Sequence, residues 1–148
     1  HQNERMVSMV RQKMGEVNGK RIAFLGLTYK PDTDVIEESA AIKIAGALLK
    51  EDATLAVYDP AGMESARKTL GEKGVGYADS AKECLKDADF CILATPWNEF
   101  KSLKPNDFIA GMKQPVLLDC WKLYDRAEFS REMDYTTIGF YKDSGNEG

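Results

Sequence analysis

Short apolar runs alternate with segments of helical periodicity along most of this chain, and this alternation constrains the fold more than any other feature. Four of the runs are bounded by turn residues and are too short for helices, which indicates buried strands. They cover residues 21–26, 54–58, 90–95 and 116–119, and shorter edge strands are expected at 75–77 and 137–141. Strands that alternate with helices form βαβ units, so the sequence predicts an α/β fold: a doubly wound parallel sheet in a three-layer α-β-α arrangement.

Apolar residues at helical spacing predict a helix after most of these strands. Ser39 is a suitable N-cap for the first of them, which carries Ile44 and Leu48 on one face. Either Asp79 or Ser80 is expected to start another. The later helices are expected over 61–72, 81–86 and 105–112.

An amphipathic helix is expected before the first strand. Its apolar stripe consists of Met6, Val10, Met14 and Val17, at spacings of four, four and three. Asn18-Gly19 is a suitable pair for the helix end. The stripe either packs on the sheet or contacts another chain, and the second interpretation predicts weak self-association.

Composition argues against several classes of protein. The chain has 20 Lys and Arg against 24 Asp and Glu, a net charge of −4, which disfavours a nucleic-acid-binding protein with a basic face. No apolar stretch approaches the ~18 residues of a membrane span. Cys84, Cys91 and Cys120 form no CxxC pair and are expected to be buried free thiols in a reducing, cytoplasmic compartment. His1 is the only histidine, which nearly excludes a Ser-His-Asp triad and a His/Cys zinc site.

Ligands of doubly wound sheets bind at the carboxyl ends of the strands, near the point where the strand order reverses. The loop over 27–39 is long and contains Lys30, a cation suited to a phosphate or carboxylate, although an exposed lysine on a well-ordered loop is an equal alternative. Gly26 stands alone, so the GxGxxG dinucleotide fingerprint is missing. Lys122, next to Trp121, would bring a second cation to the same edge.

Two further loops at this edge each allow two interpretations. Asp59 either holds a ribose hydroxyl or caps the next helix from an Asp-Pro turn, and the capping interpretation is favoured. Trp97 and Phe100 are three residues apart and share one side of a helical turn. They form either a stacking platform or part of the core, and the core is the more common role.

Four ordered motifs resemble the carboxy-terminal domain of the UDP-glucose/GDP-mannose dehydrogenases. They are KRIAFLGLTYKPDTDVIEES, AVYDPAGM, ATPWNEF and VLLDCWKLYD, and the resemblance covers about residues 3–125. It implies a Rossmann-like nucleotide-sugar-binding domain over 19–141. Residues 1–18 would then be the end of a helix that joins two domains and builds a homodimer. The tail over 142–148 has no apolar anchor and is expected to be disordered.

The resemblance implies an enzyme that oxidises the C6 alcohol of a nucleotide sugar to a uronate in two NAD-dependent steps. The cysteine nucleophile and the main NAD site would belong to an amino-terminal catalytic domain, so this chain is expected to be inactive alone. A stand-alone nucleotide-binding or regulatory module of the same fold is the alternative. A receiver-like signalling domain is disfavoured because residues 25–27, Leu-Gly-Leu, stand where it needs an acidic cluster.

The resemblance also assigns candidate binding residues. Lys30 matches the motif lysine that reaches the phosphate or sugar of the substrate, and Tyr29 matches the aromatic residue before it. Thr33 and Asp34 match the Thr-Asp pair of the same loop.

Two positions depart from the family pattern. Glu37 stands where many members have an arginine that touches NAD, and Trp121 stands where many have the arginine of D-x-R that contacts substrate. Lys122 would supply part of the second lost charge, although a lysine cannot reproduce the two-pronged geometry of arginine. These departures favour a different nucleotide sugar, such as a GDP-sugar or an N-acetylamino sugar.

Overall fold

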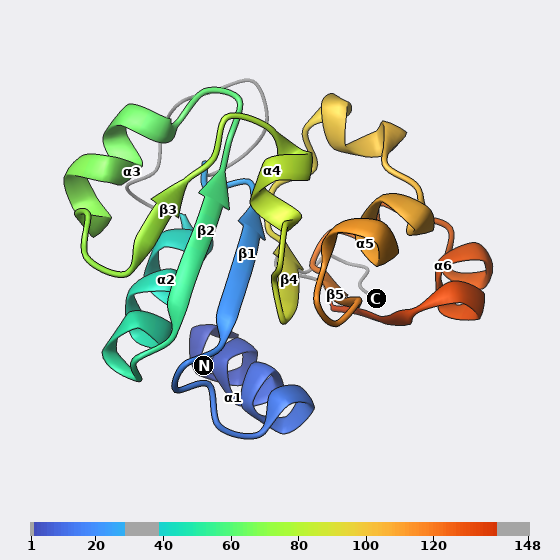
Figure 1. Ribbon diagram of the computed structural model, residues 1–148, viewed down its shortest axis with the longest axis horizontal. Coiled ribbons are helices and arrows are strands. Elements are labelled where there is room, and N and C mark those ends of the chain that lie inside the picture. Colours follow the sequence, from blue (N-terminus) through green and yellow to red (C-terminus); the bar gives the residue numbers. More distant parts are fainter. Residues whose placement is uncertain (1, 29–38, 139–148) are drawn as a thin grey trace.

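The computed structural model describes residues 2–28 and 39–138, which form one parallel sheet between two layers of helices (Figure 1). The strands are β1 (Arg21–Leu25), β2 (Thr54–Tyr58), β3 (Val75–Tyr77), β4 (Phe90–Leu93), β5 (Val116–Asp119) and β6 (Asp134–Thr137). The helices are α1 (Gln2–Met14), α2 (Ala40–Lys50), α3 (Met63–Leu70), α4 (Ala81–Leu85), α5 (Pro105–Gly111), α6 (Arg126–Glu132) and the 3-10 helix η1 (Asn98–Ser102).

All strand pairs are parallel, in the order β3-β2-β1-β4-β5-β6. The order therefore reverses between β1 and β4, which confirms the predicted doubly wound α/β fold and places the switch point between these two strands. The arrowheads of β1 and β2 point to the top of Figure 1, so the carboxyl edge of the sheet lies there.

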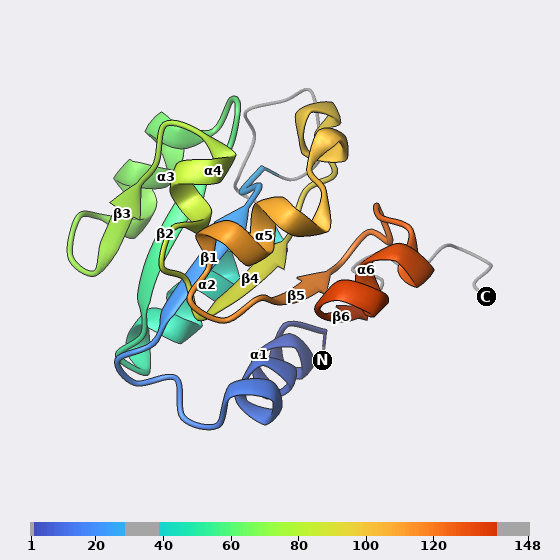
Figure 2. The same ribbon diagram turned by 45° about the vertical axis from the view of Figure 1, so that its right-hand side comes forward.

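Both faces of the sheet are covered, which explains why the central strands are continuous apolar runs. Ile22 and Phe24 of β1 pack into one core with α1, α2 and α3, whereas Ala23 and Leu25 pack into another with α4, α5 and α6. Figure 2 shows the two helical layers on either side of the twisted sheet. No helix within the described ranges is long and apolar enough to cross a membrane.

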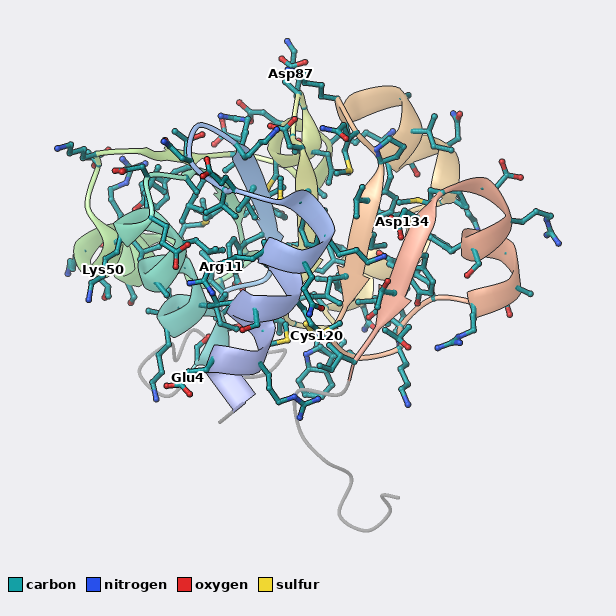
Figure 3. All side chains as sticks on the ribbon, turned by 90° about the horizontal axis from the view of Figure 1, so that it is seen from below. Glu4, Arg11, Lys50, Asp87, Cys120 and Asp134 are labelled. Atoms are coloured by element: carbon teal, nitrogen blue, oxygen red, sulfur yellow. The ribbon has the colours of Figure 1, made fainter. Side chains whose placement is uncertain are left out.

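Several local predictions are confirmed. The Ser39 side chain caps α2 by accepting a hydrogen bond from the backbone N–H of Ile42, and Ser80, not Asp79, caps α4 through the N–H of Glu83. The three cysteines are buried and unpaired, and burial raises the pKa of each thiol; Cys120 is labelled in Figure 3.

Three boundaries differ from the predictions. Helix α1 ends at Met14 because Gly15, with φ +78°, takes up the left-handed C-terminal position that the sequence suggested for Asn18-Gly19. Strand β6 begins at Asp134, three residues before the predicted edge strand at 137–141, of which 139–141 lie outside the described residues. Helix α6 was not predicted, although Asp125 caps it through the N–H of Glu128.

The apolar stripe of the first helix packs within this chain. Met6 and Val10 are fully buried, and Val17 is 3% exposed although it lies beyond the end of α1. Figure 3 shows α1 between α2 and β6, where Arg11 pairs with Glu51 at the end of α2 and Lys13 with Asp134 of β6 at 2.8 Å. The structure therefore supports the interpretation that the stripe packs on the sheet, and the stripe gives no reason to expect self-association.

We expect Gly26→Ala to destabilise the fold strongly. Gly26 has φ +97°, and an added Cβ would lie 2.5 Å from the Cβ of Thr95 and 2.7 Å from its backbone N. Strained backbone and overpacking together predict a loss of about 2–5 kcal/mol in the free energy of unfolding, measured by urea denaturation.

Gly46→Ala is the matched control, because Gly46 lies inside α2 and a Cβ there meets nothing within 4 Å. This substitution is expected to stabilise the chain by about 0.5–1 kcal/mol. Equal unfolding free energies for the two variants would contradict the close approach of Gly26, after β1, to Thr95, after β4.

Candidate functional site

The loops after β1, β2, β4 and β5 meet at the carboxyl edge around the switch point. Asp59, at the end of β2, is 1% exposed and connects the first two of these loops. Its Oδ2 accepts hydrogen bonds from the backbone N–H groups of Leu27 and Thr28, at 2.7 and 3.0 Å. Its Oδ1 accepts from the N–H groups of Ala61 and Gly62, ahead of α3, at 2.8 and 2.9 Å. The carboxylate therefore holds the turn ahead of α3. Helix α3 itself has Gly62 at its N-cap with no side-chain hydrogen bond there, so the prediction that Asp59 caps this helix is wrong. Both Asp59 oxygens are buried and accept from these N–H groups, which leaves the ribose interpretation without support.

The loop after β4 joins the same cluster through Trp97. The indole N–H lies 3.2 Å from both Asp59 Oδ2 and Thr28 Oγ1, and the Thr28 hydroxyl donates to Asp59 Oδ2 at 3.1 Å. Thr95, which is fully buried, donates its hydroxyl to the carbonyl of Thr28 at 2.9 Å. Phe100 is fully buried, as the core interpretation requires, whereas the half-buried Trp97 is held at the edge by its N–H.

A second buried carboxylate organises the loop after β5. Asp119 is fully buried; its Oδ1 accepts from the N–H of Trp121, and its Oδ2 accepts from the N–H groups of Leu123 and Tyr124. The Tyr135 hydroxyl of β6 donates to the same Oδ2 at 2.6 Å. Sequence reasoning placed Asp119 at a strand end but missed this role. The available signal was an acidic residue closing an apolar strand.

Of the predicted site residues, the structure describes Trp121 and Lys122. Trp121 is half-buried, and its indole N–H donates to the carbonyl of Ala94 after β4 at 2.8 Å. Lys122 is exposed and has φ +52°, so the loop turns sharply at this position. The other predicted residues lie outside the described ranges: Tyr29, Lys30, Thr33, Asp34 and Glu37. The convergence of Lys30 and Lys122 therefore stays a prediction.

The sequence matches one protein family over most of its length. Residues 23–126 match the profile described as "UDP-glucose/GDP-mannose dehydrogenase family, UDP binding domain". The chain belongs to this family. It is 40% identical over 111 residues to the UDP-glucose 6-dehydrogenase of Rickettsia conorii, covering 75% of this chain and 26% of the relative. It is 36% identical over 137 residues to the UDP-glucose 6-dehydrogenase AglM of Haloferax volcanii, covering 93% and 30%.

Solved structures of the same family share this fold. A UDP-glucose dehydrogenase from Pyrobaculum islandicum superposes with a TM-score of 0.76 at 27% identity, covering 94% of this chain and 29% of that one. The UDP-N-acetyl-mannosamine dehydrogenase Cap5O of Staphylococcus aureus gives a TM-score of 0.65 at 25% identity, covering 93% and 30%. The chain thus spans under a third of the length of these relatives.

The family's cofactor does not fit the described part of this chain. The loop after β1 lacks the glycines that let a backbone approach a pyrophosphate, and Asp59 is not available to a ribose. Among the described residues, no group of three His, Cys, Asp or Glu side chains is placed to hold a metal ion.

Burial raises the pKa values of three tyrosine hydroxyls, those of Tyr58, Tyr124 and Tyr135. Burial raises the pKa of Tyr58 to about 12, and its hydrogen bond to Glu99, at 2.8 Å, adds to the shift. Burial also raises the pKa of Tyr124 and of Tyr135, the second further raised by its hydrogen bond to Asp119. These hydroxyls therefore stay protonated, as donors, beyond the ordinary range of tyrosine.

We expect Tyr135→Phe to lower the free energy of unfolding by about 1.5–3 kcal/mol at neutral pH, because it removes a hydrogen bond to a buried carboxylate. The folded-state pKa of Tyr135 lies above 10, so the folded state keeps this proton after the unfolded state has lost it. The Tyr135 contribution is present below about pH 10 and is lost as pH rises further.

Urea denaturation of both proteins from neutral to alkaline pH tests this prediction. The difference between wild type and variant should shrink above about pH 10. Tyr77→Phe is the control, because the Tyr77 hydroxyl donates to a neutral acceptor, the Gly71 carbonyl, and should contribute about 0.5–1.5 kcal/mol. A smaller loss for Tyr135→Phe than for Tyr77→Phe would contradict the role of Asp119.

Proposed function

We propose that this chain is the nucleotide-sugar-binding domain of an NAD-dependent UDP-glucose/GDP-mannose-type 6-dehydrogenase. The observation that carries the proposal is that three of the four family motifs contain loops that meet at the switch point, where Asp59, Thr28 and Trp97 contact one another. The fourth motif ends in the adjoining loop, whose Trp121 donates to Ala94. The relatives named above carry the names of dehydrogenases acting on nucleotide sugars.

Within this proposal, Lys30 binds the anionic part of the nucleotide sugar and Tyr29 and Thr33 line the same loop. A lysine ammonium forms charge-assisted hydrogen bonds with a phosphate, which are stronger than neutral ones. Lys122, exposed at the end of β5, supplies a second positive charge at this edge. Trp121 presents an indole where many members have a charged guanidinium. This difference supports binding of a sugar or base other than the one that the arginine contacts.

NAD would accept the hydrides of the two oxidation steps. Because the described part of this chain does not fit NAD, we assign the cofactor to an amino-terminal catalytic domain of the same protein. Glu37 stays a prediction of a cofactor contact. We also propose that the whole protein is a homodimer, because residues 1–18 resemble the end of the helix that builds the dimer in this family.

A cytoplasmic location is supported by three buried, unpaired cysteines, which are typical of a reducing compartment.

We expect the 148-residue chain to produce no NADH from NAD and any nucleotide sugar. It lacks both the phosphate-binding glycines and the G-x-C-x-P-K-D nucleophile motif. Absorbance of NADH is the measurement, with the full-length protein as positive control. Turnover by the chain alone would overturn the assignment of catalysis to another domain. Turnover by neither protein would favour a stand-alone binding module.

Lys30→Ala in the full-length protein should weaken nucleotide-sugar binding by roughly 10- to 150-fold, because one charge-assisted hydrogen bond contributes about 1.5–3 kcal/mol. NAD affinity and the unfolding free energy should change little. Isothermal calorimetry measures both affinities. Lys113→Ala removes the same charge at the opposite edge, before β5, and should leave both affinities unchanged. Equal affinities for the two variants would leave Lys30 as a solvated loop residue.

A further inference from the structure

We propose that Trp97 is a positioning residue for the nucleotide sugar: its indole N–H holds Thr28 and Asp59, and so fixes the start of the loop that follows β1. The inference rests on the proposed function and concerns the residues that hold Leu27 and Thr28, the first two residues after Gly26.

Thr28 is constrained at all of its polar atoms. Its N–H and hydroxyl both donate to Asp59, its carbonyl accepts from the Thr95 hydroxyl, and its Oγ1 accepts from the Trp97 indole. Thr28 is 2% exposed and directly precedes Tyr29 and Lys30 in the sequence. A binding group must be held within about 0.5 Å of its productive geometry. The hydrogen bonds that fix Thr28 therefore limit where the next residues of the chain can lie.

The helix that follows Trp97 is anchored independently of the indole. Phe100 of η1 is fully buried and packs edge-to-face on Tyr58, with ring centroids 6.1 Å apart. Glu99 of the same helix accepts the Tyr58 hydroxyl at 2.8 Å. Replacing the indole by a phenyl ring should therefore leave the backbone of η1 in place, while it removes the N–H together with part of the ring that packs on the core.

The indole N–H is also dispensable for keeping the Asp59 carboxylate satisfied. Asp59 accepts from four backbone N–H groups and from the Thr28 hydroxyl without it, and such a carboxylate is adequately compensated for burial. Trp97 contributes the contact that spans from the β4 loop to both the β1 and β2 loops. Its loss should therefore affect the geometry of the binding loop more than the stability of the fold.

Trp97→Phe in the full-length protein tests the inference, with UDP-glucose, GDP-mannose and UDP-N-acetyl-mannosamine as the probes and the one that the wild type binds most tightly used for the comparison. We expect the Kd and the KM for the nucleotide sugar to rise on the order of tenfold, because small misplacements of binding groups cost large factors. The kcat at saturation and the Tm should stay near the wild-type values. Hydrogen exchange by mass spectrometry should be faster in a peptide covering 26–28 and unchanged in β4.

Tyr77→Phe is the matched control, because it removes a comparable hydrogen bond at the β3 edge of the sheet and should change neither Kd nor KM. Thr28→Val is the second variant, since it removes the hydroxyl that accepts the indole N–H while keeping the side-chain shape. If Trp97 acts through Thr28, the double variant should lose less affinity than the sum of the two single losses.

The outcomes separate the two proposals. A wild-type protein that binds no nucleotide sugar would overturn the proposed function and this inference with it. A wild type that binds, with a Trp97→Phe variant of equal affinity, would overturn only the inference. A lower Tm, together with additive losses of affinity in the double variant, would also overturn the inference, because Trp97 would then act through stability alone.

Discussion

The carboxylate of Asp59 is the group on which the carboxyl edge of this domain depends. It is 1% exposed, and it accepts hydrogen bonds from three loops that are distant in the sequence. A buried carboxylate is costly unless its oxygens are paired, and here the donors that satisfy it are the backbone groups of the loops themselves. The cost of burying the charge is thereby offset by contacts that order the edge of the sheet around the switch point.

Asp119 repeats the arrangement on the other side of the switch point. Its oxygens hold the loop that carries Trp121 and Lys122, and the Tyr135 hydroxyl connects this loop to the edge strand β6. Two buried carboxylates therefore order loops on both sides of β1 and β4, so much of the conformational entropy of the site is lost on folding and not on binding. Such preorganisation suits a domain whose proposed role is to hold a substrate for chemistry that another domain performs.

Family membership and site chemistry constrain different parts of the function. The match over residues 23–126 and the strand order establish the UDP-binding domain fold of the dehydrogenase family. The motif resemblance predicts that Trp121 stands where many members have the arginine of D-x-R. In the structure its indole N–H donates to the Ala94 carbonyl, so the loop after β5 is joined to the loop after β4 at this position.

The sequence alone determined the architecture, because the periods of apolar residues and the caps of helices are local properties. The central strands, the Ser39 cap and the buried cysteines were all predictable in this way, and the four motifs identified the family. Local signals were weaker at β6, which is partly exposed, and at the end of α1, where both Gly15 and Gly19 could end the helix. Only the tertiary structure decided what Asp59, Asp119 and Trp97 do. The partners of Trp97 and most donors to Asp59 lie in other loops, whereas Asp119 is held by its own loop and by Tyr135 of β6. Parallel pairing of the strands is what brings these segments to one edge.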